Sequence, residues 1–479
     1  MSHTVIVGGG LGGLLLADKL AAAGLAVTVL ERTDTFGGGS RFVEHADRPW
    51  PTAIYSSLGF EPGSRLAEVA SRPLDRFPVS DHVVLDGREY PLPGTLAGLE
   101  AQLGAWFPAE RSGLGRFVAA VSEVYQAIDA SLALTAAPGR MAALGRLQEY
   151  GRRTFRELRD ECVSDPTLRR LLAVRAFAST NTASTMLAYL GKIHVDGLYP
   201  IAGPELADRL VARLATRPNC RLRTTTEVTG LAFDAEGRRA EAVITADGER
   251  LAADEIVLDS DLTRLDSEFV ADPTARAVFA PHLDGFLPGL SGLTLQFALD
   301  PAFRSALERL AGAARIYVVD DADPLDVLVR REAGELTLAT FKVNLDRAAP
   351  EPLVGVEIDA TPEAVRDGVP AAVAERVVGV LEQLLPGFGA AVRAEVTFTP
   401  QDYAHWSGAR GGTASGFRDA VARPFLLYRA LERRGISSVG QWSLFGSGLS
   451  QLELSAQTTF QAIRRRALAR PAPTAESAP

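Results

Sequence analysis

The sequence predicts an α/β fold in which helices alternate with the strands of a parallel sheet. Two observations near the N-terminus predict it. A β-branched run at residues 5–7 ends at a glycine-rich turn, and leucine and small side chains then continue from 14 to 23 without a breaker. The stretch AVTVLE, residues 26–31, has the composition of a second strand. Strand, turn, helix and strand form a βαβ unit, whose two strands are parallel.

The turn between the first strand and the helix carries glycines at the spacing G-x-G-x-x-G. Gly8 makes the tight turn, Gly10 lets the backbone approach a pyrophosphate, and Gly13 allows the helix to pack closely on the strand. Leu11 and Gly12 complete the loop. Because the first amide groups of a helix and its dipole both favour negative charge, this Rossmann-type turn is expected to hold the diphosphate of a dinucleotide.

A second group of residues follows directly. Glu31 closes the second strand, roughly 20 residues after the loop, as expected of a carboxylate that binds an adenosine ribose. Arg32 follows, then Gly38 and Gly39, with Arg41 just beyond. This succession resembles the signature of the large FAD-dependent family that includes amine oxidases, protoporphyrinogen oxidase, phytoene desaturases and carotenoid isomerases, with one residue inserted before the arginine. The resemblance implies FAD as cofactor, and Arg41 is expected to lie against its pyrophosphate.

The C-terminal part supports the same resemblance. The stretch GISSVGQWSLFGSGLSQLELSAQTTFQAI resembles the family's flavin motif, in which Gly440, Gly448 and Leu449 match a turn that approaches the isoalloxazine ring. Gln441 stands where the family usually has an acid that binds the ribityl or pyrophosphate portion, and an amide still forms hydrogen bonds there without the charge. The resemblance also implies that Val228 contacts the adenine with its backbone.

Local signals predict further elements. Asp86-Gly87 is a hairpin turn, and Ser164 or Asp165 can cap a helix that has Pro166 in its first turn. Residues 255–258 read as a strand, followed by acids at 259 and 261 where the family more often has small neutral residues. Strands are also expected at 293–300, 315–320 and 336–344, and an amphipathic helix near 370–385.

The resemblance implies a discontinuous FAD-binding domain and a mixed α+β substrate domain. The FAD-binding domain is expected at 1–80, 194–262 and 418–466. A largely helical substrate-side region is expected at 81–193, a substrate domain with sheet and helices at 263–417, and a disordered tail at 467–479.

Composition excludes several functions. The net charge of −9, with basic residues spread singly along most of the chain, argues against nucleic-acid binding. No run of about 18 apolar residues predicts a spanning helix, although a peripheral membrane contact stays open. The chain has only two cysteines, and its six histidines lack metal-ligand spacing, so we expect a cytoplasmic protein without a metal site. The excess of arginine over lysine and the abundant alanine suggest a GC-rich bacterial genome, where secondary pathways are common.

Within the family, the stretches VVLDGREYPLP and FTPQDYAHW resemble most the phytoene desaturase and carotenoid isomerase branch. The resemblance implies hydride transfer between an allylic carbon of an apolar polyene or isoprenoid-like substrate and flavin N5, as a desaturation or a redox-neutral isomerisation. The family pattern Phe-x-x-Asp-x-Gly is replaced here by His-Ala-Asp-Arg at 45–48, so a shorter polyene, such as a carrier-bound acyl chain, is also considered.

Two alternatives stay open at this point: an FAD-dependent amine oxidase, and a non-catalytic prenyl-binding escort protein, against which the intact glycine fingerprint argues. No catalytic acid or base is assigned. The candidates near the expected substrate channel are His194, Tyr199, Tyr403, His405 and Trp406.

Overall fold

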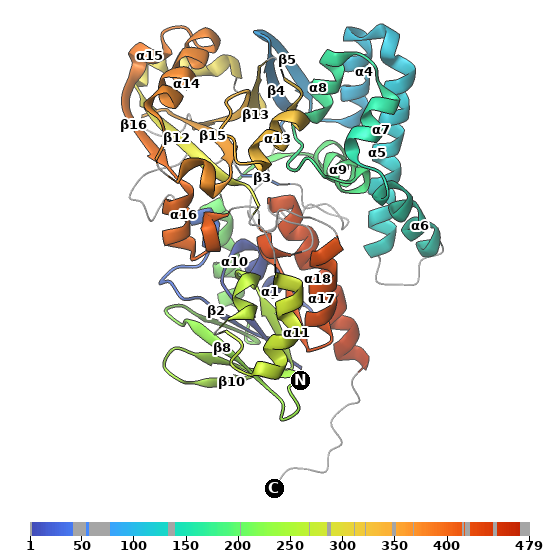
Figure 1. Ribbon diagram of the computed structural model, residues 1–479, viewed down its shortest axis with the longest axis vertical. Helices are drawn as coiled ribbons and strands as arrows, with labels where there is room; N and C mark the ends of the chain where they lie inside the picture. The colour runs from blue at the N-terminus through green and yellow to red at the C-terminus, as the bar shows by residue number, and fades with distance from the viewer. Residues whose placement is uncertain are drawn as a thin grey trace.

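A computed structural model describes most of the chain. The described residues are 2–41, 54–56, 77–132, 139–201, 203–267, 269–284, 289–310, 312–320, 322–346, 351–366, 368–413, 416, 422–443 and 448–469. Figure 1 shows three parts: a parallel sheet with its helices near the N-terminus, a larger sheet carrying α14 and α15, and a group of helices from α4 to α9. Among the described residues, no helix is both long enough and apolar enough to cross a membrane.

The first part is a five-stranded parallel sheet in the order β17-β11-β1-β2-β7, which confirms the predicted α/β fold. The central unit is the predicted one, with β1 at His3–Val7, α1 at Leu11–Ala22 and β2 at Ala26–Leu30. The expected strand at 255–258 is also confirmed as β11, Glu255–Leu258. The outer strands are β7, Cys220–Arg223, and β17, Ile436–Ser438.

Alternate side chains of β1 belong to two hydrophobic clusters, one on each face of this sheet. Ile6 packs with α1, with α10 (Gly203–Ala215) and with α18 (Leu449–Ala469) on one face. Val5 and Val7 pack on the other face, against β8 (Val228–Phe233), β9 (Ala240–Thr245), α11 (Pro273–Leu283) and α17 (Ala422–Glu432). Since successive side chains of a strand point to opposite faces, a continuous apolar run suits a strand covered on both sides. Strand β10 (Arg250–Ala252) completes the small antiparallel sheet β10-β9-β8.

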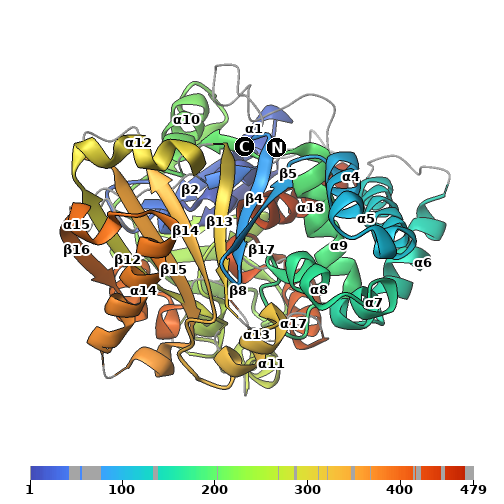
Figure 2. The same ribbon diagram turned by 90° about the horizontal axis from the view of Figure 1, so that it is seen from above.

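The second part is a seven-stranded mixed sheet in the order β16-β12-β15-β14-β13-β4-β5, seen from above in Figure 2. Its strands are β4 (Val79–Leu85), β5 (Arg88–Pro93), β12 (Ser291–Leu299), β13 (Ala313–Val319), β14 (Thr340–Asp346), β15 (Leu353–Ala360) and β16 (Val392–Phe398). The expected strand at 336–344 therefore starts only at Thr340. Helices α14 (Ala371–Leu384) and α15 (Phe388–Ala391) contribute Val377, Leu381 and Phe388 to its core.

The hairpin predicted at Asp86-Gly87 is confirmed. Both turn residues have positive φ, 49° and 74°, as a two-residue hairpin turn requires, and Leu85 pairs with Arg88. Strand β4 then runs parallel to β13. The hairpin at the start of the region 81–193 thus supplies β4 and β5 to the seven-stranded sheet, and Val83 and Leu85 of β4 are buried against the helices that follow. The domain boundaries themselves stay predictions.

The third part consists of six α-helices: α4 (Leu96–Trp106), α5 (Arg111–Leu132), α6 (Arg140–Gly151), α7 (Phe155–Cys162), α8 (Pro166–Ala173) and α9 (Ala183–Gly191). Helix α8 begins as predicted. Asp165 is its cap, because the carboxylate accepts a hydrogen bond from Leu168 N at 2.9 Å, and Pro166 holds the first position. A π-helical turn, Lys192–Asp196, follows α9, and β6 (Tyr199–Ile201) then pairs with β3 (Ile54–Ser56).

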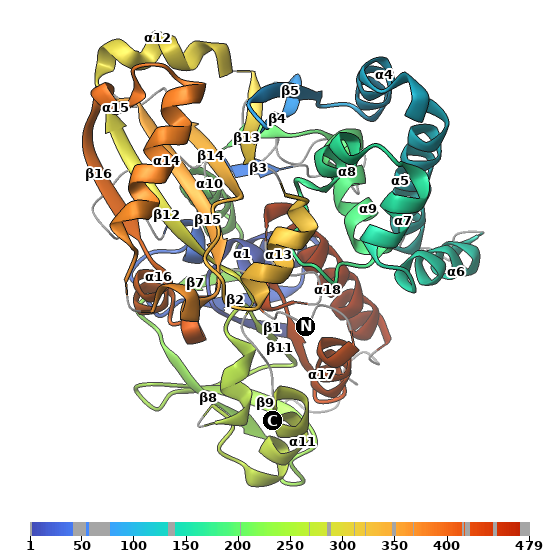
Figure 3. The same ribbon diagram turned by 45° about the horizontal axis from the view of Figure 1, so that its top comes forward.

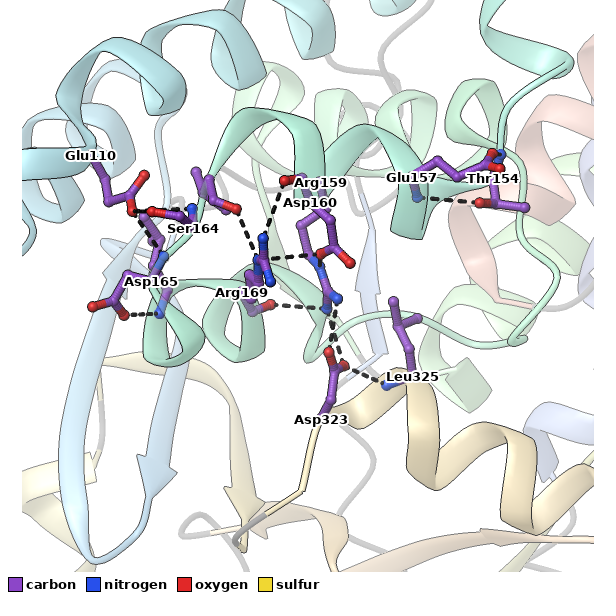
Figure 4. Close-up of polar contacts among 12 residues, drawn as sticks. Glu110, Thr154, Glu157, Arg159, Asp160, Ser164, Asp165, Arg169, Asp323 and Leu325 are labelled. Atoms are coloured by element: carbon purple, nitrogen blue, oxygen red, sulfur yellow. Dashed lines mark hydrogen bonds and ion pairs between the residues drawn. The ribbon is translucent and has the colours of Figure 1, made fainter.

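A buried arginine ties the helical part to the seven-stranded sheet part (Figure 4). Arg159 of α7 is 1% exposed, and its guanidinium donates to Asp160 Oδ1 at 2.7 Å and to Asp323 Oδ1 at 3.0 Å. Asp323 in turn caps α13 (Pro324–Glu332) by accepting from Leu325 N at 2.9 Å. This chain of contacts fixes α7 against α13.

The C-terminal helix α18 continues to Ala469, three residues into the segment expected to be a disordered tail. The remainder of that segment lies outside the described residues.

Candidate cofactor-binding site

A cavity of about 360 Å³ opens where the parallel strands end. Val7 at the end of β1, Leu30 at the end of β2 and Asp259 just after β11 all lie on its wall. In open α/β sheets, ligands bind in the crevice outside the carboxyl ends of the strands. The position of the cavity is therefore that of a nucleotide site.

The first glycine loop leaves no room for side chains. Gly8 has φ 101°, and a Cβ on it would lie 2.3 Å from the carbonyl oxygen of Asp259. A Cβ on Gly12 would lie 2.8 Å from both Cα and N of Gly440. The N-terminal and C-terminal glycine turns, far apart in the sequence, are thus in direct contact. Gly8, Gly10, Leu11 and Gly12 line the cavity, whereas Gly13 is not on its wall.

Glu31 lies on the cavity wall at the end of β2 and is buried. Its carboxylate accepts from Gly9 N at 2.8 Å and from Thr33 N at 2.9 Å. These bonds hold both oxygens in a fixed orientation, and each oxygen of an ionised carboxylate can accept more than one hydrogen bond. Glu31 can therefore bind hydroxyl groups of a ribose without losing its contacts in the protein.

The second glycine cluster folds back onto the first. Gly38 has φ 53°, and a Cβ on it would lie 2.9 Å from Gly10 Cα. Gly38, Gly39 and Arg32 line the cavity. The side chain of Arg41 is placed differently from the expectation, because its guanidinium donates to the carbonyl of Phe36 and pairs with Asp208, and Arg41 is not on the cavity wall.

The C-terminal motif closes the other side of the cavity. Gly440, Gln441 and Gly448 lie on the wall together with Val228. The side chain of Leu449 lies outside the described residues. The amide oxygen of Gln441 accepts a hydrogen bond from the Tyr403 hydroxyl at 3.3 Å. Tyr403 belongs to α16 (Pro400–Ser407), which lies between the two large sheets in Figure 3.

Among the candidate acid-base residues whose side chains the structure describes, Tyr403 is the one that lies at the cavity. Burial raises its pKa to about 12, so the phenol stays neutral near neutral pH. His405 is exposed, and His194 is buried in the π-helical turn, beside a small apolar cavity. The side chains of Tyr199 and Trp406 lie outside the described residues.

Sequence reasoning assigned no role to Asp259 and Asp261, yet both line the cavity. Asp259 Oδ2 accepts from Gly13 N at 2.8 Å, and Asp261 accepts from Thr263 N and Arg410 N, each at 2.8 Å. Burial raises the pKa of both carboxyl groups, that of Asp259 to about 7. The sequence feature that could have indicated a role for these two residues is their position directly after a fully buried strand.

The cavity fits a flavin dinucleotide. Glycines stand where a Cβ would strike the facing backbone, Leu11 and Gly12 of the first turn of α1 lie on the wall, and Glu31 stands at the ribose position of such sites. The cavity runs without a break from these residues to the C-terminal glycine turn. Among the described residues, no group of three or more His, Cys, Asp or Glu side chains could hold a metal ion.

Comparisons with known proteins agree with this geometry. Residues 6–72 match the NAD(P)-binding Rossmann-like domain. Phytoene dehydrogenase from Streptomyces griseus is 27% identical over 459 residues, which cover 89% of this chain and 86% of that protein. The lycopene-forming phytoene desaturase of a Paracoccus species is 25% identical, over 95% of this chain and 96% of that protein. The chain is an FAD-dependent oxidoreductase.

Solved structures show the same fold. Cyclohexylamine oxidase from Brevibacterium oxydans superimposes with a TM-score of 0.55 at 16% identity, over 98% of this chain and all of that chain. Putrescine oxidase superimposes with a TM-score of 0.58 at 14% identity, over 98% and 99%. At such identities the likeness concerns the fold alone. This oxidoreductase therefore combines the amine oxidase architecture with sequence similarity to phytoene desaturases.

Proposed function

We propose that this FAD-dependent oxidoreductase acts on an apolar polyene or isoprenoid-like substrate, by hydride transfer between an allylic carbon and flavin N5. The reaction is a desaturation or a redox-neutral double-bond isomerisation. The observation that carries the proposal is the sequence similarity to phytoene dehydrogenase over nearly the whole length of both chains. FAD, when bound, supplies the hydride acceptor, and the protein supplies position and electrostatics.

Each residue proposed to hold FAD is assigned to the part of the cofactor that it would contact. Gly8, Gly10, Leu11 and Gly12 with the first turn of α1 would bind the diphosphate, Gly13 would let α1 pack closely on β1, and Glu31 would bind the adenosine ribose. Arg32, Gly38, Gly39, Arg41 and Val228 would complete the adenosine side, with Arg41 acting only after leaving Asp208. The residues proposed for the ribityl and ring side are Gly440, Gln441, Gly448 and Leu449.

Tyr403 holds a residue of the proposed flavin site and keeps its own proton, which suits a reaction that transfers a hydride. Its hydroxyl donates to Gln441, and its raised pKa keeps the proton on the oxygen, so the group orients the Gln441 amide and does not act as a base at neutral pH. The side chains of β4 and β13 pack with those of α4, α5, α8 and α9 in one buried apolar core, which joins the helical part to the seven-stranded sheet. A carrier-bound acyl chain is the second form of substrate that we propose. We also propose that the enzyme is cytoplasmic and contacts a membrane peripherally.

One experiment tests the substrate class. The purified, FAD-loaded full chain is mixed without oxygen with a polyene in detergent micelles, and flavin absorbance and the substrate spectrum are recorded together. Bleaching of the flavin, or a shift in the polyene spectrum, supports the proposal. Peroxide release with a panel of amines and no response to polyenes would replace it with an amine oxidase, whereas polyene or prenyl-lipid binding without any spectral change would indicate an escort protein.

A further inference from the structure

The cofactor cavity is rich in carboxyl groups for a site that binds an anion. Among the residues that the structure describes, four carboxyl groups and two guanidinium groups lie on its wall. They belong to Glu31, Glu227, Asp259, Asp261, Arg32 and Arg264. If all of them were ionised, the wall would be net negative, and a diphosphate would add further negative charge. Like charges in a site of low dielectric repel strongly, so FAD binding favours the protonation of one of these carboxyl groups.

Asp259 lies at the first turn of α1, where the fold is expected to bind the diphosphate. It accepts from Gly13 N at 2.8 Å, and a Cβ on Gly12 would lie 3.3 Å from its Oδ1. The carboxyl group thus occupies the N-terminal turn of α1, where the fold binds phosphate oxygens. We propose that Asp259 contacts the FAD diphosphate as a neutral carboxylic acid, so that FAD binding is coupled to proton uptake by this side chain.

The chemistry of the two protonation states supports this coupling. The neutral acid has one O–H donor for a phosphate oxygen and keeps a carbonyl oxygen for Gly13 N, whereas the carboxylate has no donor and repels the phosphate. Burial is the main reason why the pKa of Asp259 rises to about 7, and the charge of Glu31 raises it further. The N–H groups of Gly13 and Gly10 act in the opposite direction and lower the pKa. Asp259 is therefore about half protonated at pH 7 before FAD binds.

The other charged and titratable groups around Asp259 are held in different ways. Glu31 accepts from Gly9 and Thr33, and Asp261 accepts from Thr263 and Arg410. Burial raises the pKa of Tyr403 to about 12, which keeps the phenol neutral up to pH 9. Asp261, whose pKa burial also raises, is thus the appropriate control.

The test measures FAD affinity against pH. Holoenzyme of the full chain is diluted in series between pH 6 and pH 9, and the fluorescence of released FAD gives Kd. If only the protonated form binds, the affinity of the wild type falls about fivefold from pH 7 to 8 and about ninefold from pH 8 to 9. Asp259→Asn, which keeps the carbonyl and adds a donor that does not titrate, is expected to be flat. Asp261→Asn is expected to keep the slope.

A second measurement needs no variant. Calorimetric titration of FAD into the full chain at pH 8, in two buffers of different ionisation enthalpy, should show uptake of about 0.9 proton per FAD bound. A wild-type affinity independent of pH, an equal slope in Asp259→Asn, or binding without proton uptake would overturn the proposal. Because the readout is FAD binding, its failure leaves the substrate class proposed above untouched.

Discussion

The contact between the two glycine turns gives the sharpest prediction. In Gly12→Ala the new methyl carbon would lie 2.8 Å from Cα and N of Gly440. Carbon atoms pack at about 3.5–4.0 Å, so the two turns must separate by about 0.7 Å or more. Both partners are backbone, and neither can rotate away. Overpacking of this kind typically costs about 1–3 kcal/mol, against which the better helix propensity of alanine returns up to about 1 kcal/mol.

The expected effect concerns the cofactor more than the fold. Separation of the turns widens the cavity where its N-terminal and C-terminal walls meet, and we expect FAD to bind at least about tenfold more weakly, equivalent to about 1.4 kcal/mol. The unfolding free energy without FAD should fall by at most about 2 kcal/mol. The assay is FAD release on dilution, with denaturant unfolding measured in parallel.

A matched control is available in Gly379, an exposed glycine of α14 whose added Cβ would meet nothing within 4 Å. Gly379→Ala should bind FAD as the wild type does and gain up to about 1 kcal/mol of stability. If Gly12→Ala also binds FAD with wild-type affinity, the two turns do not form one cofactor wall, and the reasoning is refuted.

Three further predictions concern stability. Arg159→Ala leaves Asp323 without its buried partner and should lower the free energy of unfolding by about 3 kcal/mol, measured with denaturant. The control Arg156→Ala removes an exposed ion pair on the same helix and should lower it by less than about 1 kcal/mol. Equal losses of stability in the two variants would refute the role of burial. Asp165→Ala removes the cap of α8 and should cost about 1 kcal/mol, and an unchanged midpoint would contradict it. The pKa of Asp259 is raised on folding from 3.8 to about 7, so the FAD-free protein should lose stability as pH rises through that range. The variant Asp259→Asn should not show this loss. Parallel pH profiles of unfolding for the wild type and the variant would contradict the prediction.

The sequence predicted correctly those elements that depend only on residues close to one another in the chain. The βαβ unit with Gly8 and Glu31, the hairpin at Asp86-Gly87 and the cap at Asp165 each depend on a few neighbouring residues, and the structure has all of them. Turn chemistry and capping act within about four residues, so they can be read from one segment.

Long-range pairing could not be predicted in this way. The parallel pairing of β4 with β13, which places the predicted hairpin at the edge of the larger sheet, depends on contacts across more than two hundred residues. Arg41 took Phe36 and Asp208 as partners, which no local pattern indicates. Asp259 was visible as an unusual acid after a strand, but its place at the start of α1 follows only from the assembled sheet.

The measurement that tests the central claim most directly is the titration of the purified full chain with FAD, followed by flavin absorbance after removal of unbound cofactor. The two glycine turns and Glu31 predict that the chain retains close to one FAD, and that Gly12→Ala loses it more readily than Gly379→Ala does. A chain that stays colourless after incubation with excess FAD at pH 6–7 would contradict the assignment of the cavity.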